Sequence, residues 1–452
     1  MLVKTQRFLI LGVSKSGSAV ADYLLDNNSI CYLYEELKNP KVQANILRLR
    51  EKGAFCVDEN SIDQVLSQVN AVIISPGVAI NHRIAVKAKS MGVKIIGELE
   101  FGFLNTMPTI VGVTGTNGKT TTVSLINAIL SENKTKSVLV GNVGNPVTKE
   151  INNMDKNTVC VTEVSSFQLE SVHNFCPHIS CILNIAPDHL ERHYTMENYV
   201  FLKKKILKNQ TKTEYAVLNY DDQTVKEFVN DCNATVVFVS LKEKVNGACI
   251  QDDSIYFNDE FIINLQDLPL IGEHNIYNSM FAVSVAKLLG VDNQIIRNAL
   301  ISFKGVKHRI EAIKEIGGIK VYNDSKATNT ASTISAIKTM KNPTVLILGG
   351  SEKGESYDEL FKVISESLVK HVIITGASMF NMLDSARKFN YNKITLTEDF
   401  FHTIHISKII AQNGDSILFS PACASFDKFS GYEERGEKFC QEVEKVFGEI
   451  NA

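Results

Sequence analysis

Residues 109–124 read TIVGVTGTNGKTTTVS, and this stretch decides the fold. An apolar, β-rich run, IVGV, leads into a loop of small residues from Gly115 to Gly118. Lys119 and three threonines then open the helical pattern SLINAILSEN. Glycines let backbone N–H groups approach phosphate oxygens, and the N-terminus of the following helix adds partial positive charge. The stretch therefore predicts a strand, a phosphate-binding loop and a helix.

The loop departs from the strict phosphate-loop pattern at one position. GxxxxGK[ST] requires glycine at position 113, where this chain has Val113, with Gly112 and Gly115 close by. Lys119 would still reach the β- and γ-phosphates of a nucleotide, and Thr120 could hold Mg²⁺. The alternative is a glycine-rich turn with an incidental lysine. A GK pair followed by three hydroxyl residues at a helix start favours the phosphate loop.

Composition describes an ordinary globular protein. The chain has 452 residues, of which 44% are hydrophobic and 21% charged, and its formal net charge is −3. This length allows two to four domains, and no basic excess indicates nucleic acid as a partner. There is no apolar stretch long enough to span a membrane. The apolar run FLILGV near the N-terminus is too short for a signal peptide, so we expect a cytoplasmic protein with no membrane partner.

Cysteine usage fits a reducing compartment. The nine cysteines are an odd number and follow no disulfide framework. Cys176, His178 and Cys181 are spaced closely enough for a metal site, but only Cys160 is at hand for the second pair of ligands that tetrahedral zinc needs. We therefore expect structural thiols.

The N-terminal segment predicts a βαβ unit with a ligand edge. RFLILGV, SICYLYEE and AVIISPGV read as strands. The loop after the first strand has Ser14 where a dinucleotide fingerprint has its second glycine, so that signal is weak, and Lys15 adds charge. Glu35 and Glu36 end the second strand, where a ribose-binding acid could sit, and Ser75 follows the third. These loops share the carboxyl edge of a parallel sheet, which fits either a phosphate-bearing ligand or a plain scaffold domain.

Two further strands carry polar residues past the phosphate loop. VLVGNVGNPV predicts a strand and a small-residue loop around Asn142, and TVCVTEVSS predicts a strand that ends at Glu163. An acid just past a core strand, downstream of a phosphate loop, is where Mg²⁺ is commonly held. The alternative is a surface glutamate, which the apolar run before it disfavours.

The stretch ISCILNIAPDHLERHYTMENYVFLKKK is the second one that is rich in candidate site residues. A buried strand delivers Asp188 and His189 into a loop, and a helix from about Thr195 places Tyr199 and Lys203 on one face at positions i and i+4. Three consecutive lysines begin at Lys203, and the residues alone do not choose a functional one among them.

The remaining sequence predicts a helix and then another α/β unit. GEHNIYNSMF opens an amphipathic helix in which Asn275 is either a first-turn polar contact or a cap. FKGVKHRIEAI marks a boundary, and the strands after it end in loops that carry Asp324, Thr328 and Lys353. We therefore predict an α/β protein of three domains, with a Rossmann-like domain at 1–97, a central phosphate-loop domain at 98–306 and a Rossmann-like domain at 307–452.

Several motifs together carry a family resemblance. TGTNGKTTT, EVSSFQLE, DHLERH with its lysine helix, GEHNIYN, HRIE, YNDSKATN and SPACASFDKFSGYEERG occur in the order found in the Mur ligase family, and the similarity covers essentially the whole chain. YNDSKATN resembles the branch that adds D-glutamate. Other branches carry an aspartate-tyrosine-alanine-histidine signature there, and folylpolyglutamate synthases carry DGAHNP.

The resemblance implies an ATP-dependent amide-forming reaction. ATP phosphorylates the carboxylate of UDP-N-acetylmuramoyl-L-alanine, and the amine of D-glutamate then displaces the phosphate. The cofactors implied are ATP, two Mg²⁺ ions and a carbamylated lysine at Lys203, four residues after Tyr199, with Lys204 as the fallback. A monomer is expected.

The resemblance also implies residue roles by position. The catalytic set is Lys119, Glu163, His189 and Lys203. The implied ATP contacts are Gly115, Thr116, Asn117, Gly118, Lys119, Thr120, Thr121, Asn275, Arg309 and Asp324. The implied metal ligands are Thr120, Glu163, His189 and Lys203. The contacts implied for the UDP substrate are Ser14, Lys15, Ser75 and Asn142, and those for D-glutamate are Thr328, Lys353, Ser425 and Tyr432.

Three alternatives compete with this hypothesis. A related Mur-type or folylpolyglutamate-type amide ligase could add a different amino acid. A nucleotide-binding protein could have kept the fold without turnover, although the set of Lys119, Glu163, His189 and Lys203 argues against it. A dinucleotide-dependent oxidoreductase rests on the first loop alone and is weakened by Ser14.

Overall fold

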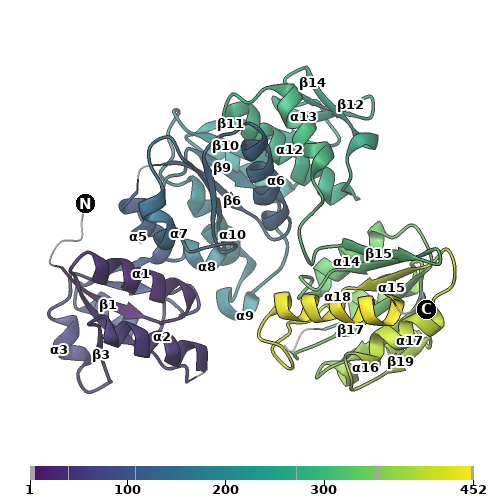
Figure 1. The fold of residues 1–452 in the computed structure, drawn as a ribbon. Coiled ribbons are helices and arrows are strands. Elements are labelled where there is room, and N and C mark those ends of the chain that lie inside the picture. The colour runs from purple at the N-terminus through teal and green to yellow at the C-terminus, as the bar shows by residue number, and fades with distance from the viewer. Residues whose placement is uncertain (1–5, 39, 107, 271, 353–355, 449–452) are drawn as a thin grey trace. The chain divides into compact units, whose positions relative to one another are not determined.

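The computed structural model describes residues 6–38, 40–106, 108–270, 272–352 and 356–448. The chain divides into two compact units, Met1–Phe303 and Lys304–Ala452. Unit 1 contains two β-sheets and unit 2 contains one, each with helices packed on it (Figure 1). These sheets confirm the predicted α/β fold with three domains, while the predicted boundaries at 97 and 306 remain predictions. Among the described residues, no helix is both long enough and apolar enough to cross a membrane.

The first sheet is parallel throughout, with the strand order β3-β2-β1-β4-β5. Its strands are β1 (Arg7–Leu11), β2 (Ile30–Tyr34), β3 (Phe55–Cys56), β4 (Ala71–Ile74) and β5 (Lys94–Gly97). Its helices are α1 (Lys15–Asp26), α2 (Pro40–Glu51), α3 (Ile62–Leu66) and α4 (Arg83–Ser90). The strand order reverses between β1 and β4, so the loops after these two strands open a crevice, where ligands of open α/β sheets bind.

The second sheet has nine strands in the order β14-β13-β12-β11-β10-β9-β6-β8-β7. Its strands are β6 (Thr109–Thr114), β7 (Ser137–Gly141), β8 (Val159–Glu163), β9 (Ile179–Ile182), β10 (Tyr215–Asn219), β11 (Thr235–Ser240), β12 (Gly247–Gln251), β13 (Ser254–Phe257) and β14 (Glu260–Asn264). Its helices are α6 (Lys119–Glu132), α7 (Val147–Glu150), α8 (Ser166–Leu169), α9 (Leu190–His193), α10 (Met196–Lys204), α11 (Gln223–Lys226), α12 (Glu273–Leu288) and α13 (Asn293–Ser302). Strand β6, which leads into the phosphate loop, lies between β9 and β8.

The third sheet has the order β15-β16-β20-β17-β18-β19, and only β15 runs antiparallel to its neighbour. Its strands are β15 (Glu311–Ile316), β16 (Ile319–Asn323), β17 (Thr344–Gly349), β18 (Val369–Thr375), β19 (Ile394–Leu396) and β20 (Ser416–Phe419). Its helices are α14 (Thr330–Thr339), α15 (Asp358–Ser365), α16 (Met379–Lys388), α17 (His402–Ile410) and α18 (Tyr432–Gly448). Together they make a second Rossmann-like unit, as predicted.

Every sheet is buried on both faces. In β1, Phe8 and Ile10 belong to one apolar cluster, whereas Leu9 and Leu11 belong to another. The central and C-terminal sheets are likewise covered by two clusters each. Successive side chains of a strand point to opposite faces, so near-continuous apolar runs such as RFLIL and TVLILG are what a parallel sheet covered on both sides requires.

Two buried glutamates fix the helix that follows the first sheet, α5 (Glu98–Leu104). The Glu98 carboxylate accepts hydrogen bonds from the backbone N–H and hydroxyl of Thr148, at 2.7 and 2.6 Å. Glu100 accepts four hydrogen bonds of 2.8–3.0 Å from the segment 173–175, three of them from backbone N–H groups. Both glutamate side chains thus accept hydrogen bonds from the central domain, at residue 148 and at residues 173–175. These bonds hold the start of α5 against that domain.

We expect Glu100→Gln to destabilise the protein, although the side chains have the same shape. Each carboxylate oxygen of Glu100 accepts two hydrogen bonds, so the amide NH₂ of glutamine must face two donors. Leaving buried donors unsatisfied costs about 1–3 kcal/mol. Urea unfolding should show this loss, while Glu132→Gln on the exposed side of α6 should leave the midpoint unchanged. Equal midpoints for the two variants would contradict the assignment.

Candidate active site

The phosphate loop requires glycine at two positions. Gly115 and Gly118 have φ angles of +147° and +87°, in the region that side chains disfavour. A Cβ at Gly118 would lie 2.4 Å from Asn278 Oδ1, and one at Gly115 would lie 2.9 Å from Leu183 Cβ. Strand β9 and helix α12 therefore pack directly against the backbone of the loop.

Side chains from α10 and from the segment just after β9 hold the loop in shape. Asn117 N donates to Asn184 Oδ1 at 2.9 Å, and Asn184 Nδ2 donates back to Asn117 O at 3.1 Å. Thr116 Oγ1 lies 3.1 Å from Tyr199 Oη. Lys119 Nζ donates to the carbonyls of Gly115 and Thr116, so its ammonium lies over the loop.

Strand β8 delivers Glu163 to the start of α6. Its carboxylate is 2% exposed and accepts from Thr120 Oγ1 at 2.7 Å and from Asn142 Nδ2 at 2.8 Å. The structure thereby brings together three of the residues singled out in the sequence. At the next residue of α6, the buried hydroxyl of Thr121 has no hydrogen-bond partner among the described residues.

Lys203 is buried beside the same loop. Its Nζ donates to Gly115 O at 2.8 Å and lies 4.7 Å from the centre of the Tyr199 ring. Burial, together with the charge of Lys119, lowers the pKa of Lys203 well below its ordinary value. Its neighbour Lys204 instead points away, to an ion pair with Asp231. The helix therefore separates two adjacent lysines that composition could not distinguish.

His189 lies in a strained loop position near the site. Its φ of +53° is in the left-handed region, and its imidazole is 41% exposed. The ring packs on Phe167 with centroids 4.8 Å apart, and its nitrogens lie 3.6 Å from Asp188 and 3.4 Å from Glu191. Within the described residues, no hydrogen bond or ion pair joins His189 to Glu163, Thr120 or Lys203.

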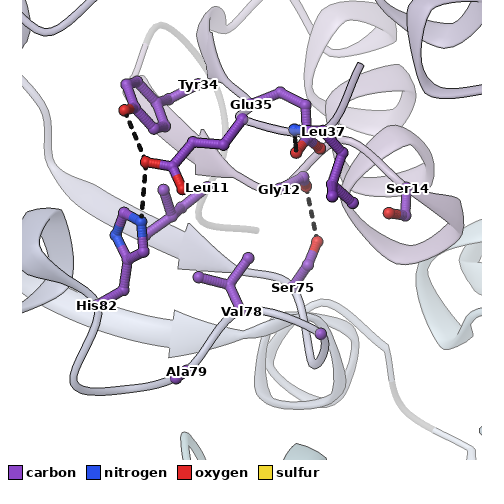
Figure 2. Close-up of a pocket in the computed structure, with 12 residues that line it drawn as sticks. Leu11, Gly12, Ser14, Tyr34, Glu35, Leu37, Ser75, Val78, Ala79 and His82 are labelled. Carbon is purple, nitrogen blue, oxygen red and sulfur yellow. Dashed lines mark hydrogen bonds and ion pairs between the residues drawn. The ribbon is translucent and has the colours of Figure 1, made fainter. Parts of the chain in front are cut away.

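The first sheet carries a pocket of about 250 Å³ at its crevice (Figure 2). Ser14 and Ser75 line it, as the sequence predicts, and Ser75 Oγ donates to Gly12 O at 2.7 Å. Glu35 shapes the rim by accepting from the backbone N–H groups of Val13, at 2.6 Å, and of Leu37, at 2.9 Å.

Lys15 does not line this pocket. Its Nζ donates instead to Gly144 O in the loop after β7, at 2.5 Å. The Lys15 ammonium, which the sequence suggested as a contact of a phosphate ligand, is therefore hydrogen-bonded to a backbone carbonyl in this structure. Lys15 as a UDP contact stays a prediction.

The C-terminal unit gathers polar groups at the carboxyl ends of β16 and β20. Asp324 is fully buried and accepts from Ser420 Oγ at 2.7 Å and from Ile310 N at 3.2 Å. Burial raises the pKa of Asp324 to about 6, against the lowering effects of Ser420 and Arg309. The strand ends are aligned, since Asn323 pairs with Phe419. The sheet therefore brings Asp324 next to the loop that carries Ser425.

The predicted D-glutamate contacts lie in loops of this unit, apart from one. Thr328 is half-buried in the loop after β16, Ser425 is buried after β20, and Tyr432 begins α18, with its ring 5.1 Å from Lys326 Nζ. Lys353 falls outside the described residues.

Comparison with known proteins places the chain in a family. It matches the Mur ligase MurD-like N-terminal domain over residues 6–97, the Mur ligase middle domain over 113–286, and the Mur ligase glutamate ligase domain over 308–423. It is 38% identical over 452 residues to the UDP-N-acetylmuramoylalanine–D-glutamate ligase of Clostridioides difficile, covering 99% of this chain and 100% of that protein. This chain belongs to the Mur ligase family.

A second relative of this Mur ligase carries the same name, and two solved structures match its fold. The ligase of the same name from Thermoanaerobacter sp. is 38% identical over 453 residues, covering 99% of this chain and 100% of that protein. Among solved structures, MurF from Acinetobacter baumannii matches with a TM-score of 0.64 at 16% identity, covering 98% of this chain and 93% of that one. MurC from Thermotoga maritima matches with a TM-score of 0.62 at 19% identity, covering 97% and 99%. These two share the fold, and membership in the family removes the oxidoreductase alternative.

Sequence reasoning missed several residues that shape this Mur ligase. Arg435 is buried and donates to the carbonyls of Ser325, Cys423 and Ala424, so it fixes the approach to Ser425. Asn184 was missed as well, although a polar residue just past the buried run ISCIL was a usable signal.

Sequence reasoning also missed a group of three side chains that line the pocket of the first sheet, namely Tyr34, Glu36 and His82. Tyr34 Oη donates to Glu36 at 3.0 Å, and His82 Nε2 lies 3.3 Å from the same carboxylate (Figure 2). The sequence suggests Glu36 as one of two acids that could bind a ribose at the strand end, but it does not indicate these two partners. Nothing in the local pattern of α4 indicated that His82 would face it.

The buried Asp324 should make stability depend on pH. The folded protein keeps this proton up to about pH 6, whereas the unfolded chain loses it near the ordinary value of 3.8. The contribution of Asp324 is therefore fully favourable below about pH 4 and is lost as the pH rises through about 6. The loss amounts to at most about 3 kcal/mol.

Comparing melting temperatures of wild type and Asp324→Asn from pH 4.5 to 7.5 tests this prediction, because the amide cannot ionise. The wild type should lose stability relative to the variant as the pH rises. Parallel curves would contradict it.

Proposed function

We propose that this Mur ligase joins D-glutamate to UDP-N-acetylmuramoyl-L-alanine at the expense of ATP, in the synthesis of peptidoglycan precursors. The observation that carries the proposal is the full-length similarity to D-glutamate ligases together with the MurD-like N-terminal domain. The phosphate loop and the acid beside it supply the chemistry of an ATP-dependent ligase. We also propose that the enzyme acts as a monomer in the cytoplasm.

The reaction forms one amide bond in two steps. The carboxylate of the alanyl group attacks the γ-phosphorus of ATP, so that ADP leaves and an acyl phosphate forms. The amine of D-glutamate then attacks the acyl carbon, loses a proton, and expels inorganic phosphate. Both steps bring anions together, and catalysis therefore needs cations and oriented dipoles around the phosphoryl group.

The chain's own groups meet that need in the phosphate loop. Gly115 and Gly118 let the loop turn with positive φ angles against Leu183 and Asn278, and Lys119 places an ammonium over the loop. We propose that the loop residues 115–121 bind the phosphates of ATP, and the partnerless hydroxyl of Thr121 supports a bound group at this point. Asn275, Arg309 and Asp324 complete the proposed nucleotide contacts.

The pair formed by Thr120 and Glu163 fits a magnesium ion. Their oxygens lie 2.7 Å apart, close to the spacing of about 3 Å between neighbouring ligands of an octahedral Mg²⁺. We propose Thr120, Glu163, His189 and a modified Lys203 as the ligands of two ions. When bound, these ions neutralise charge on the transferring phosphoryl group.

Lys203 fits carbamylation. Only a neutral amine adds carbon dioxide, and burial holds the pKa of Lys203 well below its ordinary value. The carbamate exchanges a buried cation for an anionic oxygen ligand, which suits Mg²⁺. In the unmodified chain, the amine is held by Gly115 O.

We propose that the pocket of the first sheet binds the UDP end of the substrate through Ser14 and Ser75, which line it. We propose Lys15, next to Ser14 in the chain, as a further UDP contact, and Asn142 as a contact of the sugar and peptide. Glu163 already orients Asn142, at 2.8 Å. For D-glutamate we propose Thr328, Lys353, Ser425 and Tyr432. The support for these four positions is that the sequence motifs around them resemble those of the family.

A phosphate-release assay tests the proposed activity. With ATP, magnesium and UDP-N-acetylmuramoyl-L-alanine, we expect release that depends on D-glutamate and is at least about a hundredfold faster than with L-glutamate, glycine, L-lysine or D-alanine. Release with another amino acid but not with D-glutamate would assign the enzyme to another branch of the family. Release with none of them would overturn the proposal.

The two adjacent lysines provide a matched pair for the carbamylation hypothesis. Lys203→Ala should lower turnover by at least about a thousandfold, because a buried ligand is lost, and bicarbonate should restore part of it by occupying the space of the carbamate. Lys204→Ala should retain turnover, since Lys204 contacts Asp231 at the surface. Full activity of the Lys203 variant would refute the assignment, as would equal losses in both variants.

A further inference from the structure

Arg192, in the short helix α9, reaches from the central domain to the first one. Its Nη2 donates to Val78 O at 3.0 Å and to Pro76 O at 3.3 Å, and its Nη1 donates to Gly77 O at 3.4 Å. Three consecutive backbone carbonyls thus converge on one guanidinium. Both domains belong to unit 1 of the chain.

The other side of the guanidinium is fixed by the central domain. Nε and Nη2 of Arg192 donate to the two oxygens of Glu170, at 3.1 and 2.7 Å. The Glu170 side chain is 8% exposed and that of Arg192 is 17% exposed. The guanidinium also stacks on Phe167, 4.9 Å from the ring centre. A paired, bidentate arginine with so little exposure has one well-defined position.

Two of the three carbonyls belong to residues that line the pocket in the first sheet. Gly77 and Val78 line that pocket together with Ser75, whose hydroxyl binds Gly12 O (Figure 2). The packing is close, since a Cβ added to Gly12 would lie 2.8 Å from Val78 Cγ2. A shift of the segment 76–78 would therefore change the shape of the pocket.

Glu170 also connects this contact to the phosphate loop. His193 Nδ1 lies 3.6 Å from Glu170 Oε1, and the His193 ring packs on Tyr199 with centroids 5.4 Å apart. Tyr199 in turn meets Thr116 of the phosphate loop at 3.1 Å. One continuous set of contacts therefore joins the pocket wall to the ATP-binding loop.

We propose that Arg192 is a positioning residue that holds the pocket-wall segment 76–78, and with it the nucleotide end of the UDP substrate, in place relative to the phosphate loop. This inference rests on the proposed function for the identity of the substrate. Arginine is needed for geometric reasons, because only its planar fork can donate to a carboxylate and to several carbonyls at once.

Steady-state kinetics of the full chain tests the role of Arg192. Arg192→Ala should raise the KM for UDP-N-acetylmuramoyl-L-alanine by at least about tenfold while changing the KM for ATP less than about twofold. Arg192→Lys should recover only part of the loss, since a single ammonium can keep Glu170 but not all three carbonyls. Glu170→Gln should shift the same KM in the same direction. Arg50→Ala, an exposed arginine of α2 in the same domain as the pocket, is the matched control.

Chemical rescue separates positioning from a general structural defect. Millimolar guanidinium should lower the raised KM of Arg192→Ala towards that of wild type, and should leave the wild type and Arg50→Ala unchanged. An unchanged KM for the UDP substrate in Arg192→Ala would overturn the proposal. Equal increases of both KM values, without rescue, would overturn it too. A wild type without D-glutamate-dependent turnover would instead refute the proposed function, so the two failures are distinguishable.

Discussion

The hydrogen bond from the buried Nζ of Lys203 to the carbonyl of Gly115 ties helix α10 to the phosphate loop. The bond places a nitrogen, whose pKa burial lowers well below its ordinary value, beside the loop proposed to bind ATP. Close to this bond, Tyr199 Oη lies within hydrogen-bond distance of Thr116 Oγ1. The side chain of Asn184 bonds both the backbone N–H and the carbonyl of Asn117. The loop therefore keeps its shape through contacts from α10 and from the segment just after β9. The proposed metal, nucleotide and acyl-phosphate chemistry depends on that shape.

The fold was largely predictable because its signals are local. Apolar runs such as RFLIL, TVLILG and SILF are continuous because each strand is buried on both faces, and the loops of small and polar residues after them mark the carboxyl edge of each sheet. The helix with Tyr199 and Lys203 on one face was also visible from spacing, and its start after Thr195 is confirmed by the cap that Thr195 provides. Such patterns depend on neighbours in sequence, and those neighbours were known.

The details of the site were less predictable because they depend on partners distant in sequence. Lys203 and Lys204 are adjacent and chemically identical, and only the packing of α10 decides that one is buried and the other pairs with Asp231. Lys15 was expected at a phosphate ligand, but its ammonium meets Gly144 O, 129 residues away. Arg192 and Arg435 carry no local signal at all, since both act by satisfying backbone carbonyls of other segments. No periodicity in one stretch records which carbonyls another stretch leaves exposed.

The position of Gly118 has a consequence for how the protein comes to bind ATP during its synthesis. The backbone of Gly118 packs against Asn278, and Asn117 is clamped by Asn184, so the loop at 115–118 is completed by residues made long after it. A nascent chain that has emerged only as far as α6 has the sequence of a phosphate loop but not its conformation. Nucleotide affinity should therefore arise late, once β9 and α12 have joined the central sheet. A ribosome-bound fragment that ends before residue 278 would expose the loop without retaining ATP, and the cell's ATP would stabilise only the completed domain.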